Sequence, residues 1–237
     1  MKSIGAAVFF VVDKIDILKK VPIFGDLSDS DLRSIVDKMV SHTYKKGQII
    51  LMEDSVGEHC FFLTRGKVKI TRLSSDGREV ILALLASGDF FGEMSLLDGE
   101  SRSANVVALE NTKALTLNKE DFLTALEMYP KVAINLLREL AVRLRKSDEQ
   151  IASLSLSDAE RRIALSLLRI AEEQGIIHQG HVTVNPLPFQ QDIANMAGTS
   201  RETVSRTYGL LEADGYIDRD GRKLVIMDYD RFLSDFS

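Results

Sequence analysis

Hydrophobic and polar residues alternate in short runs between about Tyr44 and Leu117. Short alternating runs separated by glycine are typical of β-strands joined by tight turns, so we predict a β-sandwich or β-roll here. The Asp76-Gly77 pair between two runs indicates a hairpin. Helical patterns precede this region at 13–20 and 31–40. The glycines that interrupt the runs are Gly47, Gly57, Gly66, Gly77, Gly88 and Gly99.

A long helix is predicted from Pro130 onward, where hydrophobic residues change to a spacing of three and four. The seam consists of Leu137, Leu140, Leu144, Ser147, Ile151 and Leu154. Such a heptad seam usually pairs with a copy of itself, which predicts a dimer; the alternative is packing on the chain's own β-roll. Ser147 places a hydroxyl at an otherwise apolar position, where it needs a partner, so it is a candidate ligand contact.

A serine-rich segment at 153–157 interrupts this helix and predicts a hinge. Ser157-x-x-Glu160 then has the pattern of a capping box that begins a new helix ending at Gln174. We therefore divide the chain into a β-roll domain at 1–128, a dimerisation helix and hinge at 129–157, and a C-terminal domain at 158–237. The fold class is α+β.

The C-terminal domain contains two short helices, Phe189 to Ala197 and Arg201 to Ala213, separated by Gly198-Thr199-Ser200. This spacing and the glycine in the turn predict a helix-turn-helix. A hairpin, at 216–218 and 223–227 around Asp220-Gly221, is expected to form a wing. The apolar positions expected to hold the two helices together are Ile193, Met196, Val204 and Leu210.

The length of 237 residues is sufficient for two modest domains with separate cores. Cys60 is the single cysteine, which excludes an internal disulfide and suits a reducing, cytoplasmic environment. The apolar run Ile4–Val12 is too short to span a membrane and continues into Asp13-Lys14. We interpret it as a segment packed on the first domain, and we expect no membrane association.

The net charge is −5, and the part of the chain from Asp158 onward has nine basic and thirteen acidic residues. An acidic helix-turn-helix domain can bind nucleic acid only through a local basic patch. The cations available for such a patch are Arg201, Arg206, Arg219, Arg222 and Lys223.

The segment Phe91 to Val107, FGEMSLLDGESRSANVV, has residues suited to a small phosphate-containing ligand. Arg102 can hold a phosphate through two parallel hydrogen bonds, and Ser103 and backbone N–H groups can bind its remaining oxygens. Glu93 can accept a hydrogen bond from a sugar hydroxyl. The alternative is that Glu93 and Arg102 pair with each other or with solvent on a loop.

Three segments in the same order resemble the CRP/FNR family of bacterial transcription regulators: FFLTRGKVKI, SSDGREVILALLASGDF and GTSRETVSRTYGLLEADGYI. The resemblance extends over nearly the whole chain. It implies a cyclic-nucleotide-binding β-roll (jelly roll), a long dimerisation helix and a C-terminal winged helix-turn-helix. It also implies a homodimer that binds double-stranded DNA under control of cyclic AMP, with RNA polymerase as a partner.

By this resemblance, Glu93 binds the ribose 2′-hydroxyl, and Arg102 and Ser103 bind the cyclic phosphate. Ser147 faces the adenine amine, and Asp148 reaches in from the opposite subunit. Asp148 stands where the family has a serine. A carboxylate can accept hydrogen bonds equally from adenine or from guanine. Cyclic GMP or another cyclic nucleotide is therefore a possible effector beside cyclic AMP. The other residues expected at the pocket are Gly92, Ile70, Leu82, Ala83 and Leu85.

The recognition helix is expected to read DNA bases through Arg201, Glu202 and Arg206, with Ser200 and Ser205 beside them. Arginine donates to guanine and glutamate accepts from cytosine, which predicts an inverted repeat with TGTGA-like half-sites; Ser205 leaves a TTGAT-like core possible. Glu202 has an alternative role, because Thr199-x-x-Glu202 also fits a capping box.

We find no residues that support catalysis and expect no metal. His59-Cys60 can in principle ligate haem iron, but an apolar-flanked cysteine is more often buried. His178-x-x-His181 is interpreted as part of a loop.

Two alternatives to the cyclic-AMP-gated regulator remain. One is a regulator with another effector or none, and the other is a nucleotide-binding module that acts through protein contacts.

Overall fold

The computed structural model describes residues 14–74, 77–156, 158–178 and 180–236, so the prediction for Ile4–Val12 lies outside it. The chain forms two compact units, one containing the residues up to Gly77 with Leu82–Arg145, the other Arg78–Ile81 with the residues from Lys146 onward. The boundary between the two units, between Arg145 and Lys146, therefore falls inside the long helix Pro130–Leu156.

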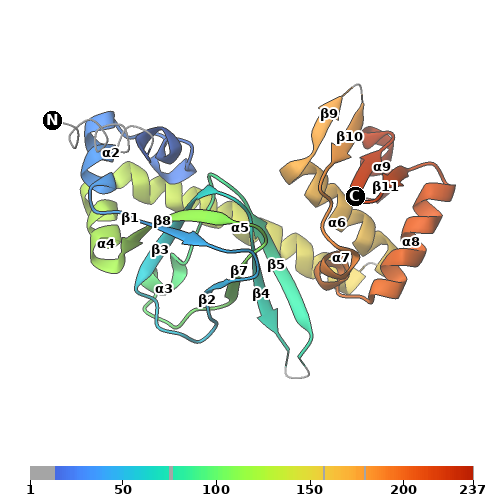
Figure 1. Cartoon of the computed structure of the whole chain (residues 1–237), viewed down its shortest axis with the longest axis horizontal. Coiled ribbons are helices and arrows are strands. Elements are labelled where there is room, and N and C mark those ends of the chain that lie inside the picture. Colours follow the sequence, from blue (N-terminus) through green and yellow to red (C-terminus); the bar gives the residue numbers. More distant parts are fainter. Residues whose placement is uncertain (1–13, 75–76, 157, 179, 237) are drawn as a thin grey trace. The chain divides into compact units, whose positions relative to one another are not determined.

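The first unit is built on two four-stranded sheets whose assigned pairs of strands are antiparallel (Figure 1). One sheet has the order β1 (Val40–Tyr44), β8 (Thr112–Asn118), β3 (His59–Arg65) and β6 (Phe90–Phe91). The other has the order β2 (Ile49–Leu51), β7 (Asn105–Ala108), β4 (Val68–Leu73) and β5 (Glu79–Leu85). The predicted β-roll is confirmed.

Strand β3 explains how this roll has two hydrophobic clusters, because its successive side chains point to opposite faces. Phe61 and Leu63 belong to one cluster with Phe91 and residues of the second sheet. Phe62 belongs to the other cluster, with the helices that cover its face. Burying one phenylalanine side chain contributes about 1.5–3 kcal/mol, so both faces of β3 stabilise the roll. The covering elements are η1 (Pro22–Phe24), α2 (Asp29–Val36), α4 (Lys119–Met128) and the start of α5 (Pro130–Leu156).

Helix α5 is 27 residues long and has two apolar faces. Val132 and Leu136 are buried, and Leu140 packs against the same cluster. Leu140 therefore contacts its own unit, as the alternative interpretation of the seam expected for this residue. Leu137 and Leu144 of the first unit are 66% and 63% exposed, so these two seam residues do not pack on the β-roll of their own unit. Ile151, in the second unit, is 63% exposed. Among the described residues no helix is both long and apolar enough to cross a membrane.

The second unit has the elements of a winged helix-turn-helix (Figure 1). Its helices are α6 (Ala159–Gln174), α7 (Gln190–Ala197), α8 (Arg201–Ala213) and α9 (Tyr229–Phe236). Its sheet has the order β11 (Ile217–Asp220), β12 (Lys223–Ile226), β10 (His181–Val184) and β9 (Ile176–His178). The predicted wing is thus half of a four-stranded sheet. His178 and His181 end two paired strands instead of lying in a loop.

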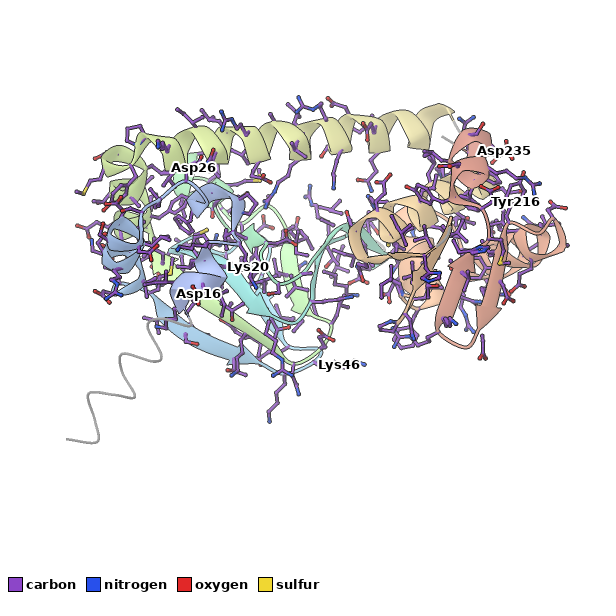
Figure 2. All side chains as sticks on the ribbon, turned by 90° about the horizontal axis from the view of Figure 1, so that it is seen from above. Asp16, Lys20, Asp26, Lys46, Tyr216 and Asp235 are labelled. Atoms are coloured by element: carbon purple, nitrogen blue, oxygen red, sulfur yellow. The ribbon has the colours of Figure 1, made fainter. Side chains whose placement is uncertain are left out.

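Two local features of this unit differ from the prediction. Helix α6 is capped by Asp158, whose side chain accepts from the backbone N–H of Arg161 at 2.8 Å; the proposed cap, Ser157, lies outside the described residues. Helix α9 was not predicted. It docks through the Tyr216 hydroxyl, which donates to Asp235 Oδ2 at 2.6 Å (Figure 2), and through the ring of Phe232.

Candidate functional site

Glu93 and Arg102 lie on the segment that connects β6 to β7, on either side of the short helix α3 (Met94–Leu97). Their exposed fractions are 2% and 4%. Among the described residues these are the charged side chains that are almost completely buried. No ion pair joins them in the described structure, so the alternative in which they pair with each other or with solvent is wrong.

Arg102 is held by neutral oxygens. Its Nη1 donates to Ser95 Oγ at 2.8 Å and to the Gly92 carbonyl, and its Nη2 donates to the His59 carbonyl at 2.7 Å. Burial lowers the pKa of Arg102, and the charge of Glu93 partly offsets this effect. The buried Nε has no hydrogen-bond partner within the described part of the structure. A buried cation with an unused N–H fits an anionic ligand such as a phosphate.

Two glycines make room for this guanidinium. Gly92 has a φ of +81°, and a Cβ there would lie 2.8 Å from Arg102 Nη1. A Cβ at Gly57 would overlap Ser95 Oγ and approach Arg102 Cζ to 3.3 Å. Gly57 and Ser95 were not among the predicted site residues, because only the tertiary fold brings them to Arg102.

Replacing Gly92 with alanine is expected to destabilise the roll more than the same change at Gly99. Both glycines have positive φ, but nothing lies within 4 Å of a Cβ at Gly99. The backbone strain of about 1–2 kcal/mol is common to both variants, and crowding of Arg102 adds about 1–3 kcal/mol to the Gly92 variant. Urea unfolding of the two variants measures the difference, and equal stabilities would contradict the packing role of Gly92.

Glu93 is bound by a residue that the sequence analysis missed. Arg143 on α5 donates from Nη1 to Glu93 Oε1 at 2.9 Å and from Nη2 to the Phe90 carbonyl at 2.7 Å. Its guanidinium also lies 4.4 Å from the centre of the Phe90 ring. The available signal was its place one helical turn before Ser147. This contact connects the ligand segment to the long helix.

The other predicted ligand residues are not all brought together. Ile70 and Leu85 pack against the cluster between the sheets, and Ala83 is half-buried. Leu82 is exposed and precedes Ala83 on the strand, so the two point to opposite faces. Ser103 is exposed beside Arg102.

Ser147 and Asp148 are exposed on α5 and belong to the second unit. Their contact with a nucleotide bound at Arg102 therefore stays a prediction.

In the second unit, α7 and α8 form the predicted helix-turn-helix. Gly198 ends α7 in the left-handed region, with φ of 60°, which favours glycine. Val204, Tyr208 and Leu211 form the buried face of α8, whereas Leu210 is exposed. The expectation that Leu210 holds the helices together is wrong, because positions seven apart, such as 204 and 211, share a helix face.

The exposed face of α8 presents the predicted recognition residues. A surface hollow of about 460 Å³ is lined by Gln190 of α7 and by Arg201, Glu202, Ser205 and Arg206. Four predicted side chains therefore face one concave surface at the start of α8. Gln190 was not predicted, although its place at the first residue of α7 is visible in the sequence.

Ser200 has a structural role at this face. Its Oγ accepts from the Thr203 backbone N–H at 3.2 Å, so Ser200 and not Thr199 caps α8. The proposed Thr199–Glu202 capping box is wrong. The pKa of Glu202 is lowered because its carboxylate accepts from its own backbone N–H and from the Ser200 hydroxyl. Glu202 remains exposed and ionised, as base recognition requires.

The wing arginines contact the protein itself. Arg219 forms a double hydrogen bond with Glu212, and Arg222 Nε donates to the Leu187 carbonyl at 2.9 Å. The arginine guanidinium of Arg222 also lies over the Phe189 ring. Two of the five cations proposed for the basic patch, Arg219 and Arg222, are therefore engaged within the protein.

Both sites lie in segments that match models of known families. Residues 41–129 match the model of the cyclic nucleotide-binding domain, and residues 161–234 match that of the Crp-like helix-turn-helix domain. The chain belongs to the CRP/FNR family of transcription regulators.

Several CRP/FNR relatives are similar over most of their length. The cyclic AMP receptor protein of Thermus thermophilus is 37% identical over 203 residues, which cover 84% of this chain and 89% of the relative. The CRP-like cAMP-activated global transcriptional regulator of Mycobacterium tuberculosis is 29% identical, with 91% and 96% covered. The structure of FixK2 from Bradyrhizobium japonicum superposes with a TM-score of 0.73 at 27% identity, with 83% and 96% covered.

Cys60 is buried in the roll, and its thiol donates to the Phe91 carbonyl at 3.5 Å. Burial, together with the charge of Glu93, raises the pKa of this thiol well above its ordinary value. Because the thiolate is the metal ligand, this environment disfavours haem ligation by Cys60.

Proposed function

We propose that this protein is a homodimeric transcription regulator whose binding to a specific operator is controlled by cyclic AMP. The observation that carries the proposal is the buried Arg102, whose Nε has no hydrogen-bond partner among the described residues and whose guanidinium packs closely against Gly92 and Gly57. The hydrogen-bond partners of Arg102 are neutral oxygens, and a bound phosphate supplies the negative counter-charge that they do not. The relatives named for cyclic AMP support the choice of nucleotide. The regulator acts in the cytoplasm, with RNA polymerase as partner, and not as an enzyme.

The residues of the roll have distinct tasks in this proposal. Arg102 and Ser103 hold the phosphate, and Glu93 accepts from a sugar hydroxyl. One hydrogen bond from Arg143 leaves Glu93 able to accept more, because a carboxylate accepts up to about four. Ser147 and Asp148 contact the base, and Asp148 keeps cyclic GMP as the second candidate effector.

The exposed seam of α5 supports the dimer. Three large apolar side chains, Leu137, Leu144 and Ile151, repeat every seven residues on the helix surface. A two-fold dimer presents its two α8 helices to successive major grooves about 34 Å apart, so the operator is an inverted repeat with TGTGA-like half-sites. A module acting only through protein contacts is disfavoured by the helix-turn-helix match.

Alanine at Arg201 or Arg206 is expected to weaken operator binding by about 1–3 kcal/mol each, because each arginine donates to a guanine. Fluorescence anisotropy with an operator duplex and with base-substituted duplexes measures the loss. Arg231→Ala is the matched control, since Arg231 pairs with Asp235 on α9. Equal losses on the operator and on a scrambled duplex would show that the arginines contact phosphates instead.

Cyclic AMP is expected to raise operator affinity at least several-fold. A base held by Ser147 and Asp148 favours one arrangement of the dimer helices, and DNA favours the same one by reciprocity. Calorimetric titration with cyclic AMP, cyclic GMP and cyclic di-GMP identifies the nucleotide that binds. Anisotropy with and without that nucleotide then compares the parent with the variant carrying Ser147→Ala and Asp148→Ala.

The double variant is expected to bind DNA without responding to nucleotide. Equal affinity of the parent with and without any of the three nucleotides would refute ligand control and favour an effector-independent regulator.

A further inference from the structure

Arg219 of the wing strand β11 reaches back to the recognition helix. Its Nε and Nη2 donate to Glu212 Oε1 and Oε2 at 2.7 and 3.0 Å. Its guanidinium carbon lies 4.3 Å from the centre of the Tyr208 ring. Glu212 and Tyr208 are four residues apart on α8, so one side chain of the wing contacts two successive turns of one helix face. We call these three residues the wing clamp.

The charges of the wing clamp cancel within the protein. The hydrogen bonds from Arg219 lower the pKa of Glu212, so the carboxylate stays ionised opposite the guanidinium. Both side chains are largely covered, with 24% and 34% of their surface exposed. A planar guanidinium with two parallel hydrogen bonds and a ring beneath it is held in direction as well as distance.

The ring of Tyr208, and not its hydroxyl, makes this contact. Tyr208 is fully buried, and its hydroxyl has no hydrogen-bond partner among the described residues. An unpaired buried hydroxyl does not itself stabilise the fold. The ring face carries partial negative charge that attracts a cation such as Arg219.

The wing clamp is placed to orient the reading residues. It contacts the second half of α8, whereas Arg201 and Arg206 lie in the first half of the same 13-residue helix. A short continuous helix moves as one body, so a change of its angle at Tyr208 and Glu212 displaces the arginine side chains. We propose that Arg219 is a positioning residue that, through Glu212 and Tyr208, sets the angle between wing and recognition helix and so determines DNA selectivity without contacting DNA. This inference rests on DNA binding by α8 but not on the identity of the effector.

The competing role for a wing arginine is a direct phosphate contact, and the two roles predict opposite results for Glu212→Gln. If Arg219 contacts phosphate, removing the negative charge of Glu212 strengthens DNA binding. If Arg219 acts through the wing clamp, the same change weakens selective binding even though the protein becomes less acidic.

The experiment uses the full chain and the duplex that it selects from a randomised pool. Anisotropy measures affinity for this duplex and for a scrambled one at several salt concentrations. Glu212→Gln and Arg219→Gln are each expected to lower the ratio of the two affinities by about 5-fold or more, and the double variant is expected to lose little beyond either single one. The salt dependence is expected to stay unchanged.

Three controls separate positioning from general stability. Asp214→Asn removes the same charge from the exposed end of α8 and is expected to preserve the ratio. Tyr208→Phe retains the ring and is expected to do the same. Thermal melting confirms that each variant is folded at the temperature of the assay.

The outcomes identify which proposal fails. An affinity ratio that rises or stays unchanged in Glu212→Gln, or a salt slope that falls by about one in Arg219→Gln, would overturn the wing clamp. A loss in Tyr208→Phe would show that the hydroxyl contributes and would overturn the assignment of this contact to the ring alone. If the unmodified protein selects no duplex from the pool, the proposal of specific DNA binding is refuted. The inference about selectivity is then rejected together with it.

Discussion

Replacing Arg102 with alanine is expected to abolish binding of the cyclic nucleotide. The guanidinium is buried and its Nε has no partner among the described residues, so the phosphate would lose a desolvated cation and the hydrogen bond from that Nε. Truncating one partner of such a pair costs about 2–5 kcal/mol, which corresponds to a loss of affinity of about 30-fold to several thousand-fold. Calorimetric titration with cyclic AMP measures the loss directly.

Two further variants make this test specific. Arg72→Ala is the matched control, because Arg72 lies on the same roll but is exposed and pairs with Glu53 at 2.8 Å. Arg102→Lys keeps the charge but not the planar fork, so an intermediate affinity is expected. Thermal melting establishes that the variants are folded. An unchanged affinity in folded Arg102→Ala would refute the assignment of the phosphate site.

Glutamate at both Leu144 and Ile151 is expected to convert the dimer into monomers. Both side chains are more than half exposed in the single chain and would be buried in the paired seam. The double variant removes four buried apolar side chains per dimer, each contributing about 1.5–3 kcal/mol, and introduces four like charges. Light scattering measures the mass, and operator affinity should fall because one subunit reaches one half-site.

Val142→Glu is the control for this prediction. Val142 is an exposed apolar residue of the same helix, but its side chain lies on nearly the opposite side of the helix axis from the seam residues. We expect this variant to remain dimeric. If the Leu144 and Ile151 variant also remained dimeric, the interface would lie on another surface.

The sequence by itself determined the order of the elements and the kind of site each domain carries. Alternating runs between glycines predict strands, and the spacing around Gly198 predicts the helix-turn-helix, because these patterns reflect the periods of the strand and the helix. The recognition residues were predicted from the same local sequence patterns. Arg201 and Arg206 are charged residues at the start of one predicted helix, and both are exposed in the structure.

Local pattern was not sufficient where two elements compete for one side chain. Leu140 has the spacing of the dimer seam, yet it packs on its own unit. Leu210 is as apolar as Leu211, but only Leu211 lies on the buried face with Val204. Which face of an amphipathic helix is covered depends on the neighbour that the fold supplies.

The tertiary structure alone decided the partners of the charged residues. Glu93 is bound by Arg143, Arg102 by the carbonyl of His59, and Arg219 by Glu212. The first two contacts join residues far apart in the chain, and the third joins the wing to a helix across a turn. Hydrogen bonds and burial depend on distance in space, and only the folded backbone brings these groups within reach of one another.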